Sequence, residues 1–159
     1  MLKSKFFWIC AVALFLLITL FLYLYQTRAT KANIIKVFIE NKESFESIRQ
    51  YAEDTEGKLY IYNISGTVVV SNKPDDGSLR AVDLEALPIK QDVKNIIFKL
   101  KYAGINEESG PYLQGVIVFS RTSGQEEQGI FYTNDDQTVY GQEIEKISDG
   151  WYYYWIGNV

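Results

Sequence analysis

The sequence has no histidine and only one cysteine, Cys10. Without histidine the chain has neither a His-dependent catalytic triad nor a histidine-ligated metal site, and a single cysteine excludes an intramolecular disulfide. The motifs S-x-x-K and G-x-S-x-G do not occur, and no glycine-rich phosphate loop follows a strand-like segment. We therefore predict a protein that is not an enzyme, with no catalytic residue, no cofactor and no metal site.

Residues that break helices are absent from the first third of the chain. No glycine precedes Gly57 and no proline precedes Pro74, so nothing in residues 3–56 obliges a helix to end. Beyond position 30, apolar residues recur at helical spacing: Ile34, Phe38, Phe45, Ile48 and Ala52. We expect one helix of about 50 residues whose apolar stripe packs on the domain's own sheet, with a coiled-coil or partner-binding helix as the alternative.

Charge is absent from Phe6–Tyr25, which reads FFWICAVALFLLITLFLYLY. A helix of this length spans about 30 Å and matches the hydrocarbon core of a bilayer, whereas the apolar part of a signal peptide has about 7 to 15 residues. We predict that residues 1–30 are a membrane anchor, with an uncleaved signal anchor favoured over a cleaved signal peptide or a buried soluble helix. The lipid bilayer is then the partner of Phe6–Tyr25, and residues 31–159 form an extracytoplasmic domain.

The direction of this segment is predicted from its flanks. Lys3 and Lys5 precede it, and four Lys or Arg residues lie between positions 28 and 42. Basic residues tend to stay on the cytoplasmic side, and their numbers on the two sides of the segment are nearly equal. A tail of five residues before a first apolar segment is typical of a signal anchor. We therefore expect a single-pass protein of the cell membrane, with the N-terminus in the cytoplasm and the C-terminal domain outside.

The region beyond the apolar run is acidic. Of the 16 Lys and Arg residues two precede the run, and the 14 that follow stand against all 20 Asp and Glu, a net charge of −6. Nucleic-acid binding requires a basic footprint, so we predict no nucleic-acid partner. Another protein or a cell-wall polymer remains as a possible partner of the domain.

The rest of the pattern predicts an α+β domain. A helix is expected over residues 89–103, with Gly104 ending it, and strands over residues 58–63, 67–72, 112–121, 128–133, 143–147 and 151–156. Ser65-Gly66 and Asp149-Gly150 are typical of tight hairpin turns. The predicted fold is a transmembrane helix followed by two helices packed on a mainly antiparallel sheet of about five or six strands.

Aromatic residues are concentrated at the C-terminal end. In a strand, Trp151, Tyr153 and Trp155 share one face while Tyr152 and Tyr154 share the other. Trp151, Tyr153 and Trp155 are our candidate interaction surface, which would stack on sugar rings or bind a partner. In the alternative interpretation, one face packs on the helices and the other shields the sheet.

Four segments carry a resemblance to a known group of proteins. They are F-I-E-N-K-E-S-F-E-S-I at residues 38–48, an isoleucine-rich helix near residues 95–100, Q-G-I-F-Y at residues 128–132 and D-G-W-Y-Y-Y at residues 149–154. Together they resemble small uncharacterised proteins of Gram-positive bacteria that are membrane-anchored or secreted and end in an aromatic D-G-W-Y-Y-Y segment. The resemblance implies a compartment and a fold, and it transfers no catalytic residue.

These observations favour a membrane-anchored extracytoplasmic binding or interaction module. One alternative is a structural subunit of a pilin-like surface assembly, although no glycine precedes Phe6 and no glutamate lies five residues into the apolar run. A second alternative is an immunity or inhibitor protein whose acidic surface blocks a toxin.

Overall fold

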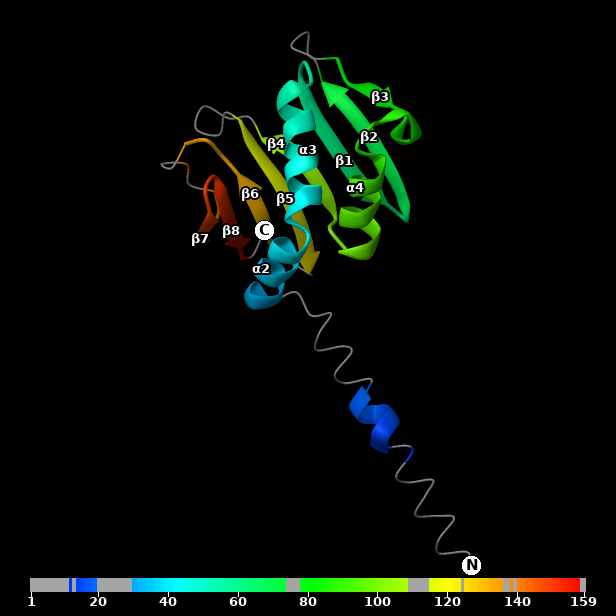
Figure 1. Ribbon diagram of the computed structural model, residues 1–159, viewed down its shortest axis with the longest axis vertical. Helices are drawn as coiled ribbons and strands as arrows, with labels where there is room; N and C mark the ends of the chain where they lie inside the picture. Colours follow the sequence, from blue (N-terminus) through cyan, green and yellow to red (C-terminus); the bar gives the residue numbers. More distant parts are fainter. Residues whose placement is uncertain are drawn as a thin grey trace, which may run out of the picture.

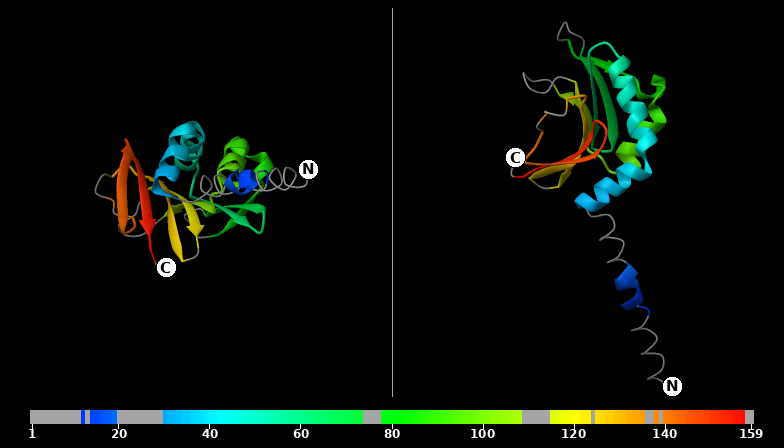
Figure 2. Two further views of the ribbon diagram at one scale, coloured as in Figure 1. Left: turned by 90° about the horizontal axis from the view of Figure 1, so that it is seen from below. Right: turned by 60° about the vertical axis from the view of Figure 1, so that its left-hand side comes forward.

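An eight-stranded antiparallel sheet, with its helices on one face, organises the domain (Figure 1). The computed structural model describes residues 12, 14–19, 30–73, 78–108, 115–123, 125–135, 138 and 140–157. Two further views show the helices gathered on one side of the curved sheet (Figure 2). The predicted α+β class is confirmed, whereas the predicted architecture is wrong in its strands and in its helices.

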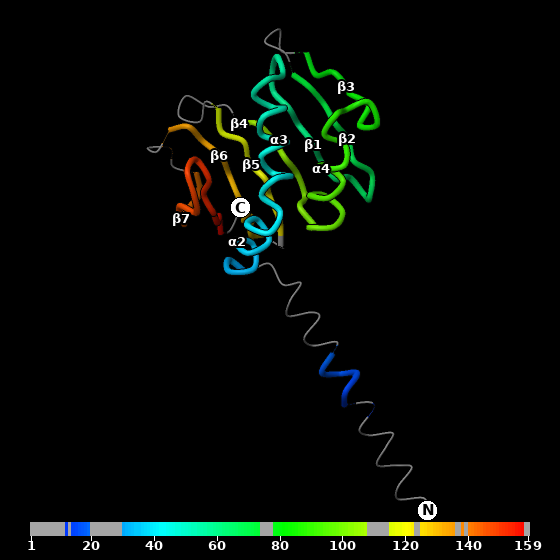
Figure 3. The backbone as a smooth tube through the Cα atoms, in the orientation of Figure 1, coloured from blue at the N-terminus to red at the C-terminus, as the bar shows by residue number. Residues whose placement is uncertain are grey.

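The expected helix of about 50 residues is wrong, because two residues interrupt it. Thr30 is extended (φ −97°, ψ 150°), and its side chain accepts a hydrogen bond from the Asn33 N–H as the N-cap of α2 (Lys31–Glu40). Asn41 (φ −125°, ψ 21°) separates α2 from α3 (Lys42–Asp54), and Figure 3 traces this bend. Threonine and asparagine bond to nearby backbone groups, so they end helices without glycine or proline.

The transmembrane helix of the predicted fold also requires correction. Among the described residues, none belongs to a helix that is both long and apolar enough to cross a membrane. The longer described helices, α2 and α3, have 10 and 13 residues, and at about 1.5 Å per residue both are too short for the hydrocarbon core. Most of Phe6–Tyr25 lies outside the described residues; residues 14–19 within it are helical and exposed.

The sheet has eight strands where five or six were expected. The two that the pattern missed are β3, which is only three residues long, and β4, which contains one isoleucine and no other strongly strand-forming residue. The strand expected over residues 112–121 begins at Val116, and residues 112–114 lie outside the described residues. The strand order is β3-β2-β1-β4-β5-β6-β8-β7, all antiparallel. The bounds are β1 Lys58–Ile64, β2 Thr67–Lys73, β3 Arg80–Val82, β4 Gly104–Glu108, β5 Val116–Ser123, β6 Glu126–Tyr132, β7 Glu143–Ser148 and β8 Trp151–Ile156.

The second predicted helix ends earlier than Gly104. A short 3-10 turn, η1 (Leu84–Ala86), precedes α4 (Lys90–Lys94), which continues as a π-helix, η2 (Asn95–Lys99). The Leu100 N–H donates to the Asn95 carbonyl, and Lys101 then takes a left-handed backbone conformation (φ 63°). Gly104 starts β4 instead of ending the helix. The predicted apolar face is confirmed, since Val93, Ile96 and Ile97 are buried.

Two apolar clusters stabilise the sheet from its two faces. The larger joins the buried faces of α2, α3 and α4–η2 to one face of the sheet. The smaller lies on the opposite face over β5, β6 and β8 and contains Val116, Val118, Phe131, Tyr152 and Tyr154. Both predicted hairpins are confirmed: the Ser65-Gly66 turn has φ of 52° and 84°, and Gly150 has a φ of 72°.

Candidate functional site

The predicted surface of Trp151, Tyr153 and Trp155 lies mainly inside the molecule. Trp151 is 1% exposed and Tyr153 is 2% exposed, both in the core beneath the helices, and Trp155 is half-buried against the same core. Tyr152 and Tyr154 lie in the smaller cluster on the other face, as strand alternation predicts. Rings as deeply buried as those of Trp151 and Tyr153 offer no face for a sugar to stack on.

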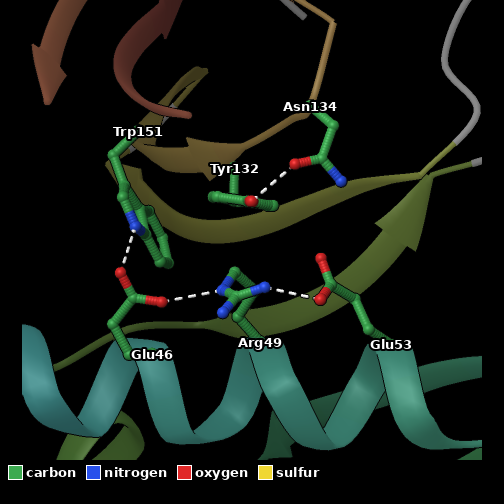
Figure 4. A network of polar contacts seen from close by, with 6 residues as sticks. All are labelled: Glu46, Arg49, Glu53, Tyr132, Asn134 and Trp151. Carbon is green, nitrogen blue, oxygen red and sulfur yellow. Dashed lines mark hydrogen bonds and ion pairs between the residues drawn. The ribbon is translucent and has the colours of Figure 1, made fainter. Parts of the chain in front are cut away.

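Trp151 instead belongs to a polar network that joins α3 to the sheet (Figure 4). Its indole N–H donates to Glu46 Oε1 over 2.7 Å, and Arg49 Nε donates to Glu46 Oε2, also over 2.7 Å. Arg49 Nη1 donates to Glu53 on the next turn of α3. The guanidinium carbon lies 4.7 Å from the centre of the Tyr132 ring, and Tyr132 itself donates to Asn134.

The electrostatics of this network favour a structural role. Partial burial disfavours the charged form of Arg49, but the hydrogen bonds to Glu46 and Glu53 outweigh that effect and raise the pKa of its guanidinium. Both oxygens of Glu46 accept hydrogen bonds, and Arg49 stacks on an aromatic face. The network therefore holds α3 in register against β6 and β8 and presents no free base.

The aromatic surface that the sequence analysis missed lies on the helix-free face of β1 and β2. Leu59, Ile61 and Val70 point into the main core, so the alternate positions face away from the helices. We call Tyr60, Tyr62, Ile64 and Val69 the open-face patch. Tyr62 is 40% exposed and Ile64 is 58% exposed, and Val69, directly opposite Tyr62, is also exposed.

The two tyrosine rings of the open-face patch are arranged side by side. Their centres are 6.4 Å apart and their planes differ by 25°. Gly104 on the neighbouring β4 has no side chain, and a Cβ there would lie 2.8 Å from Tyr62 Cδ1, so the Tyr62 ring lies over the Gly104 backbone. The alternation of Tyr60 and Tyr62 was visible in the sequence, but only the position of the helices shows which face of β1 is uncovered.

Two other regions gather polar or charged side chains: an ion-pair cluster at Lys31 and a surface hollow at the α2–α3 junction. The first is Lys31, the first residue of α2, whose ammonium donates to Glu143 Oε1 over 2.6 Å and also pairs with Glu145 on edge strand β7; these hydrogen bonds raise the pKa of Lys31. The second is a surface hollow of about 450 Å³ at the α2–α3 junction, lined by residues 39–44. The hollow is lined by Ser44 and by the carboxylates of Glu40 and Glu43, but Ser44 Oγ accepts a hydrogen bond from the Asn95 amide, and no hydrogen bond among the described residues joins it to a carboxylate.

Within the described ranges no group of three or more Cys, Asp or Glu residues is placed to hold a metal ion. Burial raises the pKa of the Glu107 carboxyl, with the Lys58 charge acting in the opposite direction. The Glu53 charge raises this pKa further, but Glu107 belongs to no group of three ligand side chains among the described residues, so it carries no assignment.

No protein-family model, curated protein or solved structure matches this chain. Its function is therefore inferred from the chemistry of its own residues.

Proposed function

We propose that this protein is an interaction module attached to the cell membrane, with its domain outside the cell. The uncharged apolar sequence of Phe6–Tyr25 and the net charge of −6 beyond Lys5 support this placement. The resemblance to membrane-anchored or secreted proteins of Gram-positive bacteria supports the same compartment. In this proposal the lipid bilayer is the partner of Phe6–Tyr25, and the domain binds a second partner.

The observation that carries the binding role is the open-face patch. Three large apolar or aromatic side chains, Tyr62, Ile64 and Val69, are exposed next to one another on a sheet whose other face carries the main core. Contiguous exposed apolar surface on a domain with a complete core is typical of a binding surface. Tyrosine adds a large rigid contact area and a hydroxyl, and it is enriched at interfaces.

The chemistry of the patch favours another protein as the partner. The patch has no charged member, and its neighbours across the strands, Ser71 and Asn106, are small polar residues. An apolar centre with a polar rim is the ordinary anatomy of a protein interface. We therefore propose binding, without a catalytic step, to a protein surface that presents apolar side chains.

The test is photo-crosslinking in cells with a matched pair of positions. Ile64 in the patch is 58% exposed, and Ile39 on α2 is 61% exposed, so both sites are equally accessible while only one lies in the patch. A photoreactive amino acid at position 64 should give a defined protein adduct, and the same group at position 39 should give none. Equal adducts at both positions, or none at position 64, would contradict the binding role.

The identity of the adduct separates the alternatives. A ladder of self-adducts in membranes would support a structural subunit of a surface assembly, and an adduct with a secreted toxin would support an inhibitor. Location is tested separately by membrane fractionation and by protease treatment of intact cells. Removal of the domain by protease is expected, and complete protection would overturn the proposed orientation.

A further inference from the structure

We propose that Phe98, Lys99 and Lys101 form a second contact with the membrane, in which the two ammonium groups bind anionic lipid headgroups and Phe98 enters the headgroup region. We call these three residues the basic end of η2. This inference rests on the membrane attachment proposed above, and it adds the surface by which the domain itself contacts the lipid.

The register of the sheet places the basic end of η2 at the end of the domain where the chain enters from its apolar segment. Arg121, Gln128, Trp155 and Glu143 form one row across β5, β6, β8 and β7, and Lys31 is paired with Glu143 at the end of that row. Ala103 continues this row toward β1, because its N–H donates to the Ser120 carbonyl and its carbonyl accepts from the Asn63 N–H.

The basic end of η2 therefore lies on the near side of the domain. Residues 98–101 lie two to five positions before Ala103, so they lie at the same end of the sheet as Lys31. In Figure 1, α2 and the end of the helical segment that follows α4 lie toward the same, lower end of the domain.

The length of the connecting chain keeps this end near the bilayer. Only residues 26–30 lie between the last residue of the apolar run and the start of α2 at Lys31. Five residues span at most about 18 Å when fully extended. A modest tilt of the domain is therefore enough to bring lysine side chains at this end to the headgroups. Salt limits the attraction between an ammonium group and an anionic headgroup to distances of about 8 to 10 Å.

The side chains of the basic end are available for such a contact. Phe98 is 39% exposed, and Lys99 and Lys101 are exposed. In the part of the chain that the structure describes, neither lysine forms an ion pair, whereas Lys90 and Lys94 at the other end of the same helical segment pair with Glu85. Lysine beside an exposed aromatic ring is the side-chain combination that favours anionic membrane interfaces.

The acidic groups at this end are placed away from these lysines. Glu143 and Glu145 are both paired with Lys31, and Glu126 and Glu127 lie at the start of β6, with β5 between them and β4.

The experiment uses the full chain reconstituted in vesicles, with Cys10→Ser to allow labelling at one new cysteine. A fluorophore at Thr67→Cys reports on the end of the β1–β2 hairpin near η2, and one at Glu56→Cys reports on the opposite end. Headgroup-attached quencher is included in phosphatidylcholine vesicles with or without about one third phosphatidylglycerol. Quenching at position 67 should rise at least twofold with the anionic lipid, and quenching at position 56 should not change.

Two charge-matched double variants test the assignment. Lys99→Gln with Lys101→Gln should abolish the dependence on anionic lipid, and Lys90→Gln with Lys94→Gln should preserve it. If quenching does not depend on lipid charge, or if both double variants abolish that dependence equally, the lipid contact is wrong while the membrane attachment is unaffected. Failure of the full chain to float with vesicles overturns the membrane attachment and this inference together. Retention of the domain by a soluble polyanion, with no response to lipid charge, would assign the lysines to a cell-wall polymer instead.

Discussion

At the residue scale, single side chains of this protein decide how closely neighbouring strands and helices approach. Trp151 is the clearest example, because its indole fills the core beneath α3 and its N–H also binds the Glu46 carboxylate. Arg49 then links that carboxylate to Glu53 and stacks on Tyr132. A hydrogen bond to a charged acceptor is worth about 1.5 to 3 kcal/mol. Such residues stabilise the domain and are poor candidates for a ligand contact.

Gly129 on β6 is a site where any side chain should be disruptive. A Cβ there would lie 2.0 Å from the Phe119 carbonyl oxygen, which is backbone and has no room to move. We expect Gly129→Ala to lower the free energy of unfolding by about 3 kcal/mol, measured by urea denaturation. Gly66→Ala is the control, because nothing lies within 4 Å of that Cβ and only its φ of 84° is unfavourable, at about 1 kcal/mol. Equal losses would contradict the close approach.

Lys101 is a residue where stability and the proposed lipid contact should change in opposite directions. Glycine accepts the left-handed backbone conformation without the steric cost that lysine bears. We expect Lys101→Gly to raise the free energy of unfolding by about 0.5 to 1 kcal/mol, and the same variant should reduce the response to anionic vesicles. A loss of stability would show that the lysine side chain makes a structural contact.

At the element scale, the α2–α3 bend results from packing more than from Asn41 alone. Phe38 on α2 and Phe45 on α3 are 5.2 Å apart, and both rings contact Trp151. A straight helix would direct these two residues along one line, whereas the curved sheet requires two shorter helices at different angles. The Asn41 amide also donates to the Val37 carbonyl, which occupies part of the broken helical turn.

Two substitutions separate these contributions to the bend. Phe38→Ala should lower the free energy of unfolding by about 3 to 5 kcal/mol, because Phe38 is fully buried. Asn41→Ala should cost about 1 kcal/mol or less, because it removes one partly buried hydrogen bond and adds helix propensity. Denaturant unfolding of both variants provides the measurement. A larger cost for Asn41→Ala would mean that asparagine itself imposes the bend.

At the scale of the whole molecule, buried tyrosines should make the protein sensitive to alkali. Burial raises the pKa of Tyr102 above its ordinary value of 10.0, with the Arg121 charge opposing the shift, and burial followed by the Glu127 charge raises the pKa of Tyr154. A folded-state pKa above the unfolded-state value means that the folded protein holds the proton more tightly. The resulting stability is complete below pH 10 and is lost as pH rises above it.

Tyr102→Phe should reveal the contribution of one hydroxyl. Within the described part of the chain, the Tyr102 hydroxyl is buried without a hydrogen-bond partner. We expect the variant to be about 1 kcal/mol more stable at pH 8, and its unfolding midpoint should fall less between pH 9.5 and about 11. Urea titrations across this range test both effects. Lower stability at pH 8 would indicate that a partner, such as a bound water, satisfies this hydroxyl.

Local chemistry made part of the fold predictable. The strands on either side of Ser65-Gly66 and of Asp149-Gly150 were predicted to within one residue, because turn residues and alternating side chains act over short distances. The apolar faces of α2, α3 and α4 were predicted from spacing and are confirmed by burial. β3 and β4 escaped prediction because they are strands through pairing with neighbours and not through their own composition.

The sequence by itself determined the absence of histidine chemistry, the acidic charge beyond the apolar run, and which side chains share a face of each strand. Only the tertiary structure decided which of those faces are covered. Helix packing buried Trp151 and Tyr153 and left Tyr62 and Ile64 exposed, although all four are large residues in strands. The physical reason is that alternation is a local property of the backbone, whereas burial depends on where distant helices dock.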